Sequence, residues 1–460
     1  MVKTVTRILC CPYGYWETRK PLHITAVKGG LETLSASTTA LIILAVTIVL
    51  FATGKIPLAV TAMASALAMG IFGIIPFSKA FAGFSSDVTV MVMGSIVIGE
   101  TLFETGVAQK MGTTIIKMVG TNERLFIIVC VVLAAVLSAF LSNTAVVAMM
   151  MPVVAATAAS SKGKITKKGS YMAIGFAANV GGGMTLVGST PNVIGQGLLA
   201  DSGLEVMGFF DLTLGSIPRL LFMVVFYATL GYTLQKKVFT FDESEPSGSE
   251  APVPAQEAVQ EERSVIKMAI SAAILVFAVT GFVLGFWTVG AVAMASALLC
   301  VLTGCISLKK LFLRMDWNTV WVLAGSLGLA AGISESGAGQ LIADFFIGLL
   351  GENISLFKLL LVFTLISVIL GNLMSSTATM AMLGPIAISM CTSLGFSAKP
   401  VIMVIIWALN LAFLTPTATV PVTMTLQGGY RFLDYTKIGA ILMAGCLILT
   451  VVTYPFVFDL

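Results

Sequence analysis

Four polar interruptions of otherwise apolar sequence are the places where this chain could do chemistry. Two are short hydroxyl- and amide-bearing segments, Ser142-Asn143-Thr144 and Ser375-Ser376-Thr377. The other two, residues 181–192 and 415–421, are rich in threonine and proline, and the first also carries glycines. Proline and glycine clusters interrupt helices and free backbone N–H and carbonyl groups.

Broken helices of this kind supply two sorts of ligand at once. Half-helix N-termini carry partial positive charge and open N–H groups, which suit an anion. Freed carbonyls and hydroxyl oxygens suit a small hard cation such as Na⁺. The single histidine, His23, lies in the polar N-terminal stretch, so histidine-based metal or acid–base chemistry is not indicated. The pattern therefore predicts anion and cation binding without a buried Lys or Arg.

The elements that carry these interruptions must lie in lipid. Of the 460 residues, 57% are hydrophobic and 10% are charged, whereas a soluble domain carries about a quarter charged residues. Apolar runs of helix-spanning length recur along the chain, and their helix-like pattern argues against an outer-membrane barrel. The net charge of +4 is spread over loops, so nucleic-acid binding is not indicated. We predict an all-α, multi-pass protein of the inner cell membrane.

The apolar runs predict ten full spans and two longer, interrupted stretches. The spans are expected near 38–53, 56–75, 88–106, 170–200, 213–235, 265–285, 287–305, 318–333, 399–427 and 437–457. The interrupted stretches, 124–160 and 356–393, are too long for one span. Bare polar backbone at membrane depth is tolerated only inside protein or along a cavity. Each stretch is therefore predicted to be a re-entrant helical hairpin with its polar segment at the tip.

The two halves of the chain repeat one another. The run AMASAL occurs at 62–67 and again at 293–298, and Gly94-Ser95 recurs as Gly325-Ser326. At nearly the same spacing Glu104 matches Glu335, and the first hairpin tip matches the second. Each half then holds five spans and one hairpin, and an odd number of spans turns the second half upside down. The sequence predicts two inverted repeats.

Loop charge orients the spans. If Lys162, Lys164, Lys167 and Lys168 are cytoplasmic, the other basic loops also fall inside, and the loop with Asp201, Glu205 and Asp211 falls outside. This agrees with the positive-inside rule. Ten spans nevertheless place the basic N-terminal arm outside; it crosses or re-enters the membrane, a first span is missing, or the arm is exported.

Charged residues inside the spans have two interpretations. Glu100 lies deep in its span, where a carboxylate is either functional or structurally paired. Glu104 and Glu335 are cation ligands or solvated helix-end residues. Arg219 is interpreted as an interface anchor near the end of a span.

Several motifs together resemble the divalent anion/sodium symporter family, whose members carry di- and tricarboxylates or sulfate. They are IPLAVTA at 56–62, SAFLSNTA at 138–145, GSTPN at 188–192 and GGYRFLDY at 428–435. The resemblance covers nearly the whole chain from residue 38 onward. It implies a homodimer that works as an elevator, in which hairpins and broken helices slide against a dimerising scaffold.

This plan divides the chain into a polar arm, two repeats and an acidic cytoplasmic linker. The first repeat has a scaffold part and a transport part, with the hairpin 124–160 and the broken helix 170–200. The second has the same parts, with the hairpin 356–393 and the broken helix 399–427. The segments are 1–37 for the arm, 38–123 and 124–236 for the first repeat, 237–264 for the linker, and 265–350 and 351–460 for the second repeat.

The resemblance also implies site residues. The first sodium site would use Ser138, Ser142, Asn143 and Gly188. The substrate would be held by Asn143, Thr144, Ser189, Ser376, Thr377 and Thr419. A second, weaker sodium site would use Met374, Ser376 and Ala418.

The second half departs from the family pattern. Ser376 stands where the family tip has asparagine, and Gly371 pairs with Ser138 of the first hairpin. The second cation site therefore has fewer side-chain oxygens. This leaves two mechanisms open: a sodium-coupled dicarboxylate symporter, or a sodium-independent di- or tricarboxylate exchanger. A sulfate symporter is a further alternative.

Other classes of function are less consistent with the sequence. An intramembrane protease would need two membrane aspartates or a Ser–His pair, yet Asp87 and Asp316 lie at loop edges. We therefore predict no enzyme and no organic cofactor; sodium is the expected coupled ion. A channel would need a continuous pore, and the predicted hairpins alone do not exclude a channel.

Overall fold

The computed structural model describes residues 35–53, 55–107, 110, 122–161, 164–239, 265–350, 355–416 and 418–458. Within these ranges the secondary structure is entirely helical, so the predicted all-α class is confirmed. Nearly all of the predicted polar arm 1–37 and of the linker 237–264 lies outside the described residues.

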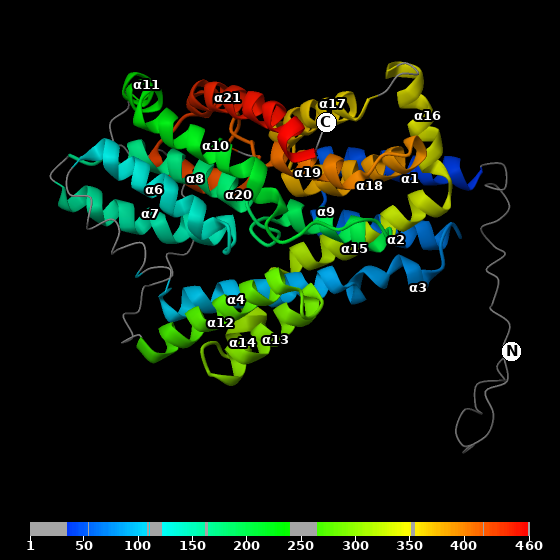
Figure 1. Cartoon of the computed structure of the whole chain (residues 1–460), viewed down its shortest axis with the longest axis horizontal. Helices are drawn as coiled ribbons and strands as arrows, with labels where there is room; N and C mark the ends of the chain where they lie inside the picture. The colour runs from blue at the N-terminus through cyan, green and yellow to red at the C-terminus, as the bar shows by residue number, and fades with distance from the viewer. Residues whose placement is uncertain are drawn as a thin grey trace, which may run out of the picture. The chain divides into compact units, whose positions relative to one another are not determined.

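The first half contains ten α-helices and one 3-10 helix among its described residues (Figure 1). Its first part comprises α1 (Ala36–Thr53), α2 (Leu58–Ile71), α3 (Phe77–Ala80), η1 (Ala82–Ser85) and α4 (Asp87–Thr105). Its second part comprises α6 (Glu123–Ser138), α7 (Asn143–Ser160), α8 (Lys167–Gly182), α9 (Thr190–Asp201), α10 (Asp211–Ala228) and α11 (Leu230–Val238).

The second half follows the same order. Its first part comprises α12 (Val265–Leu284), α13 (Val289–Leu302), α14 (Leu308–Arg314), α15 (Trp317–Glu335) and α16 (Ala338–Leu350). Its second part comprises α17 (Leu356–Leu373), α18 (Ser376–Leu394), α19 (Ala398–Leu409), α20 (Val420–Met424), η2 (Thr425–Gly428) and α21 (Phe432–Phe458).

All four polar interruptions coincide with breaks between helices. The chain leaves helical geometry between α6 and α7, and α7 lies beside α6 (Figure 1). A shorter break, Met374-Ser375, separates α17 from α18. The predicted span 170–200 is divided into α8 and α9, and the span 399–427 into α19 and α20. Helix-breaking and hydrogen-bonding residues thus end the helices where the sequence analysis places the breaks.

Apolar helices dominate the described structure. Six of them, α4, α10, α12, α17, α18 and α21, are long and apolar enough to cross a membrane. Many large apolar side chains lie on the outside, and Leu302 and Phe456 are about 80% exposed. Water would penalise such a surface, whereas lipid does not.

One close contact between the halves occurs twice, at repeat-related positions. A methyl group added at Gly94 would lie 2.5 Å from the backbone of Ala293. A methyl group added at Gly325, the partner of Gly94 in the repeat, would lie 2.5 Å from the backbone of Ala62, the partner of Ala293. Gly94 therefore lets α4 approach α13, and the equivalent Gly325 lets α15 approach α2, since no side chain separates the backbones.

Two ion pairs also connect repeat-related positions of the two halves. Lys79 lies 2.5 Å from Glu335, and Lys310 pairs with Glu104. Arg314 contacts Glu104 at 2.8 Å and Glu100 at 3.7 Å. The three glutamates that the sequence left with two interpretations are therefore all paired with basic residues in this structure.

Arg219 is a correction to the sequence analysis. Its position near the end of a predicted span indicates an interface anchor, but only 2% of its surface is exposed. Its guanidinium donates to the carbonyl oxygens of Gly215 and Trp407 and to the Ser216 hydroxyl, and it lies 5.2 Å from the Trp407 ring centre. The side chain points from α10 towards α19, where these acceptors replace water.

Candidate functional site

The first hairpin tip packs against the break between α8 and α9. Asn143 begins α7, and Ser142 caps that helix by accepting a hydrogen bond of 3.2 Å from the Ala145 amide. A methyl group added at Gly182 would lie 2.2 Å from the Asn143 side chain. A glycine at the end of α8 therefore makes room for the asparagine of the tip.

Oxygen atoms gather around one end of the Asn143 amide. The amide atom at this end lies 2.5 Å from the Ser138 hydroxyl, 3.0 Å from the Gly188 carbonyl and 3.2 Å from the Ala178 carbonyl. When this atom is nitrogen, it donates hydrogen bonds to these oxygens. When it is oxygen, it accepts from the Ser138 hydroxyl, and the Gly188 and Ala178 carbonyl oxygens face it with no donor between them. Three oxygens therefore surround this end of the amide in either orientation.

Asn192 stabilises the break itself. Its amide nitrogen donates to the carbonyls of Gly182 and Thr185, both at 2.7 Å, and its oxygen accepts from the Ser189 hydroxyl at 2.6 Å. Asn410, at the end of α19, lies 3.5 Å from the same oxygen. The helix ends at the break are therefore held by amides rather than by charged groups.

The second hairpin tip packs against the break after α19. The Ser376 hydroxyl donates to the Leu409 carbonyl at 3.1 Å. Asn372 accepts a hydrogen bond of 2.9 Å from the Leu414 amide, and its own carbonyl accepts one of 2.9 Å from Thr415. The Met374 side chain packs in an apolar cluster, which leaves only the backbone of this residue for a cation.

A second and shorter hydrogen bond also joins the two breaks. The Asn179 amide on α8 donates to the Thr419 hydroxyl at 3.0 Å. Thr144 and Thr377, which follow the two tips, are half-buried, and their hydroxyls have no hydrogen-bond partner among the described residues. These two hydroxyls remain available to a ligand.

The structure brings together part of the predicted set. Ser138, Asn143 and Gly188 lie together, whereas the Ser142 hydroxyl is used as a helix cap. Ser189 bonds to Asn192, and Thr419 to Asn179. No hydrogen bond within the described ranges joins Ala418 to Met374 or Ser376. The cation and substrate roles of all these residues stay predictions.

Three amides that hold the site are not among the predicted site residues. Asn179, Asn372 and Asn410 are all buried and hydrogen-bonded at the breaks. Each is an isolated amide within an apolar run. This isolation could have identified these residues from the sequence, because a buried amide must find hydrogen-bond partners.

A profile of the CitMHS family, described as citrate transporters, matches residues 48–388. The match covers most of the chain and includes the first hairpin and most of the second. The chain belongs to the citrate transporter family. The predicted relationship to transporters of divalent anions is confirmed at this level, as is a multi-pass membrane protein.

Two relatives of this chain show how far the similarity to individual proteins extends. The uncharacterized transporter YfbS of Escherichia coli is 30% identical over 193 residues, which are 42% of this chain and 31% of YfbS. This chain therefore spans less than a third of that relative. The sodium-dependent high-affinity dicarboxylate transporter 3 of Caenorhabditis elegans is 25% identical over 449 residues, with 86% of this chain and 78% of that protein covered.

A solved structure shares the fold. The YdaH transporter of Alcanivorax borkumensis superimposes with a TM-score of 0.61 at 14% identity, covering 91% of this chain and 97% of that one. At this identity the likeness concerns the fold alone.

Proposed function

We propose that this protein is a secondary active transporter of small divalent anions, with C4-dicarboxylates as the substrate class and sodium as the coupled ion. The observation that carries the proposal is the meeting of both hairpin tips with broken helices in one hydrogen-bonded region. Open helix ends in this region favour carboxylates. The C. elegans relative named as a sodium-dependent dicarboxylate transporter supports the same substrate class and ion.

The first sodium site would lie at the oxygen cluster around Asn143. Neutral carbonyl, hydroxyl and amide oxygens suit Na⁺, and within the described ranges no group of three or more His, Cys, Asp or Glu side chains offers an alternative metal site. Sodium would turn the Asn143 oxygen towards Ser138 and Gly188. The amide nitrogen would then face the substrate side of the tip, which couples the ion to the anion.

The substrate carboxylates would be held by hydroxyls and amides rather than by a buried cation. Thr144 and Thr377 offer unpaired hydroxyls, and Asn143, Ser189, Ser376 and Thr419 lie on the adjoining tips and breaks. Hydrogen bonds to an ionised group are about twice as strong as neutral ones, so several such donors suffice for a dianion.

The elevator mechanism and the homodimer are part of the same proposal. Close contacts pair α2 with α15 and α4 with α13, and they also pair α6 with α8 and α17 with α19, while α15 in addition contacts α9 and α18. The first set would form the scaffold parts at 38–123 and 265–350. The second would form the transport parts at 124–236 and 351–460. The contacts that occur twice between the halves support the inverted repeats.

A sodium-independent exchanger is the second candidate, and one observation favours it. Gly371 stands at the repeat position of Ser138, so the second tip lacks one hydroxyl that the first tip has. The Asn372 amide does not replace it, because both ends of that amide are already bonded to the protein. If the second sodium site at Met374, Ser376 and Ala418 is weak, only the first sodium site would couple sodium to transport.

A competition panel tests the substrate class. Uptake of labelled succinate into proteoliposomes should be saturable and reduced by unlabelled dicarboxylates, with and without sodium outside. Stronger competition by sulfate than by succinate would favour a sulfate symporter. Uptake that is unchanged without sodium and that requires dicarboxylate inside the proteoliposomes would show that the protein is a sodium-independent exchanger.

A further inference from the structure

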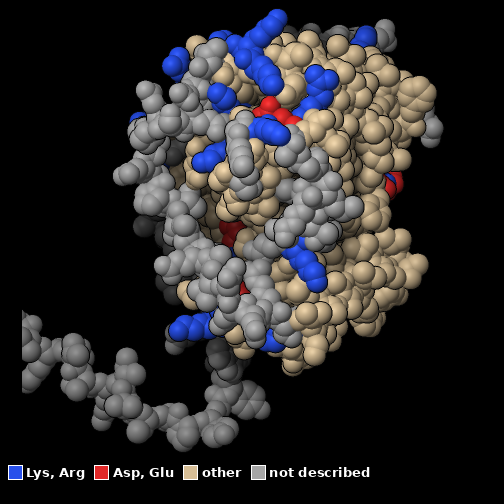
Figure 2. Space-filling view, turned by 90° about the vertical axis from the view of Figure 1, so that its left-hand side faces the viewer, with Lys and Arg blue, Asp and Glu red and all other residues tan. Residues whose placement is uncertain are grey.

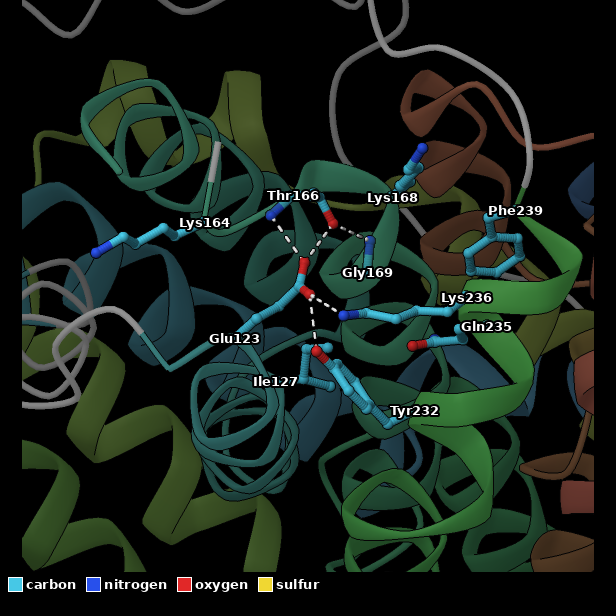
Figure 3. A pocket seen from close by; sticks show the side chains of 10 residues that line it. All are labelled: Glu123, Ile127, Lys164, Thr166, Lys168, Gly169, Tyr232, Gln235, Lys236 and Phe239. Carbon is cyan, nitrogen blue, oxygen red and sulfur yellow. Dashed lines mark hydrogen bonds and ion pairs between the residues drawn. The ribbon is translucent and has the colours of Figure 1, made fainter. Parts of the chain in front are cut away.

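A second pocket lies away from the hairpin tips. The N-terminal ends of α6 and α8 and the helix α11 enclose a space of about 360 Å³ (Figure 3). The residues that matter for its chemistry are Glu123, Lys164, Lys168, Tyr232, Gln235 and Lys236. None of them belongs to the tips or to the helix breaks described above.

Gln235 is the residue that points to a ligand. Only 2% of its surface is exposed, yet neither its amide nitrogen nor its amide oxygen has a hydrogen-bond partner among the residues that the structure describes. In Figure 3 the side chain extends from α11 with its oxygen towards the interior of the pocket. Buried amides are normally paired, so this one awaits a group that both accepts and donates a hydrogen bond.

The charges around the pocket select an anion. Among the described residues, the lysines Lys164, Lys168 and Lys236 and one carboxylate, that of Glu123, line it. Figure 2 shows the face at the left of Figure 1, where Lys and Arg side chains surround a small acidic patch. The positive-inside rule places these lysines at the cytoplasmic surface of the membrane.

The Glu123 carboxylate is occupied by the protein. One oxygen accepts from the Thr166 amide at 3.1 Å and from the Thr166 hydroxyl at 2.6 Å, and the other accepts from the Tyr232 hydroxyl at 3.1 Å. Lys236 lies 3.6 Å from that second oxygen and 4.5 Å from the Tyr232 ring centre. Glu123 therefore fixes α6, α8 and α11 together, and Lys164 adds a positive charge that no carboxylate among the described residues offsets.

We propose that this pocket binds a phosphate group that carries a neighbouring hydroxyl. The phosphate oxygens would contact Lys164 and Lys236 and accept from the Gln235 nitrogen, and the hydroxyl would donate to the Gln235 oxygen. Basic pockets at the cytoplasmic ends of membrane helices bind anionic lipid head groups. The same chemistry occurs in a phosphoglycerol lipid head group and in a soluble phosphate monoester, and the experiment distinguishes these two sources.

The test measures binding to the purified full-length protein in detergent. Native mass spectrometry would follow retention of phosphatidylglycerol against phosphatidylcholine, and calorimetry would follow glycerol 3-phosphate. Lys236→Gln and Gln235→Leu are the test variants. Lys309→Gln, on α14, is the matched control because it removes one lysine charge from another basic segment.

We expect the wild type and Lys309→Gln to prefer phosphatidylglycerol or to bind glycerol 3-phosphate, and both test variants to bind about tenfold more weakly, the effect of losing one ionic or hydrogen-bonded contact. Preference for the lipid alone identifies a head-group site, and binding of the soluble ester alone identifies a cytoplasmic ligand. Equal binding by the wild type and Lys236→Gln, or no binding of either probe above phosphatidylcholine, would overturn the proposal. A Gln235→Leu protein that is more stable but binds equally would show that Gln235 faces no ligand.

Discussion

Asn179 donates a hydrogen bond of 3.0 Å to the hydroxyl of Thr419 and so joins the broken helix of the first half to that of the second. Asn179 lies on α8, and Thr419 comes directly before α20. A bond at this place makes the position of one break depend on the other. It gives the candidate site a physical connection between the two repeats.

This connection predicts non-additive mutants. Asn179→Ala and Thr419→Ala should each reduce succinate uptake, and the double mutant should lose little more than either single mutant. The expected coupling is about 1 kcal/mol, the net value of one hydrogen bond. A double-mutant cycle on uptake rates at equal expression measures it, and fully additive losses would contradict a shared role.

Asn143→Ala tests the oxygen cluster at the first tip. We expect uptake to fall by about tenfold or more, because one amide serves the proposed cation and lies beside the substrate hydroxyls. Asn318→Ala, an exposed asparagine on α15, is the matched control and should transport normally. Normal uptake by Asn143→Ala would remove this tip from the site.

Gly182→Ala tests the close approach of the same tip to α8. The added methyl group would lie 2.2 Å from the Asn143 side chain, so the tip must move. We expect a larger half-saturating sodium concentration with little loss of folded protein. Gly348→Ala is the control, because a methyl group there meets nothing within 4 Å. Unchanged sodium dependence in Gly182→Ala would argue that sodium binds elsewhere.

The helix breaks could be predicted from the sequence because they depend on local chemistry. Ser142-Asn143-Thr144 and Ser375-Ser376-Thr377 each interrupt an apolar run, and a hydroxyl or amide at membrane depth needs a partner. The glycines and prolines of 181–192 similarly predicted that 170–200 is not one straight helix. The repeat of AMASAL predicts that α2 and α13 are equivalent helices of the two halves.

The partners of these residues could not be predicted, because they depend on tertiary packing. Nothing in the sequence places Asn179 beside Thr419, or Asn372 at the Leu414 amide. Arg219 was misinterpreted for the same reason: its position near the end of a predicted span indicated an interface anchor. Its burial follows from Trp407 and Ser216, which α19 and α10 bring to the guanidinium. The helix α16 was also missed, because its apolar residues are too few for a span.

Arg219 predicts a stability effect that can be separated from transport chemistry. Arg219→Lys keeps a charge but loses the planar group that reaches three acceptors. We expect a loss of about 3 kcal/mol in the free energy of unfolding, since a buried charge would lose its partners. Thermal unfolding in detergent, followed by a thiol-reactive dye on the buried Cys391 and Cys446, measures the change. An unchanged melting temperature would contradict the structural role.

Sodium-driven accumulation is the most direct test of the account. Proteoliposomes containing the full chain should concentrate labelled succinate above the external level when sodium is outside only. The accumulation should collapse when sodium is equal on both sides, and Asn143→Ala should abolish it. Equal accumulation without a sodium gradient, or succinate entry that never exceeds the external concentration, would contradict coupled transport at the Asn143 tip.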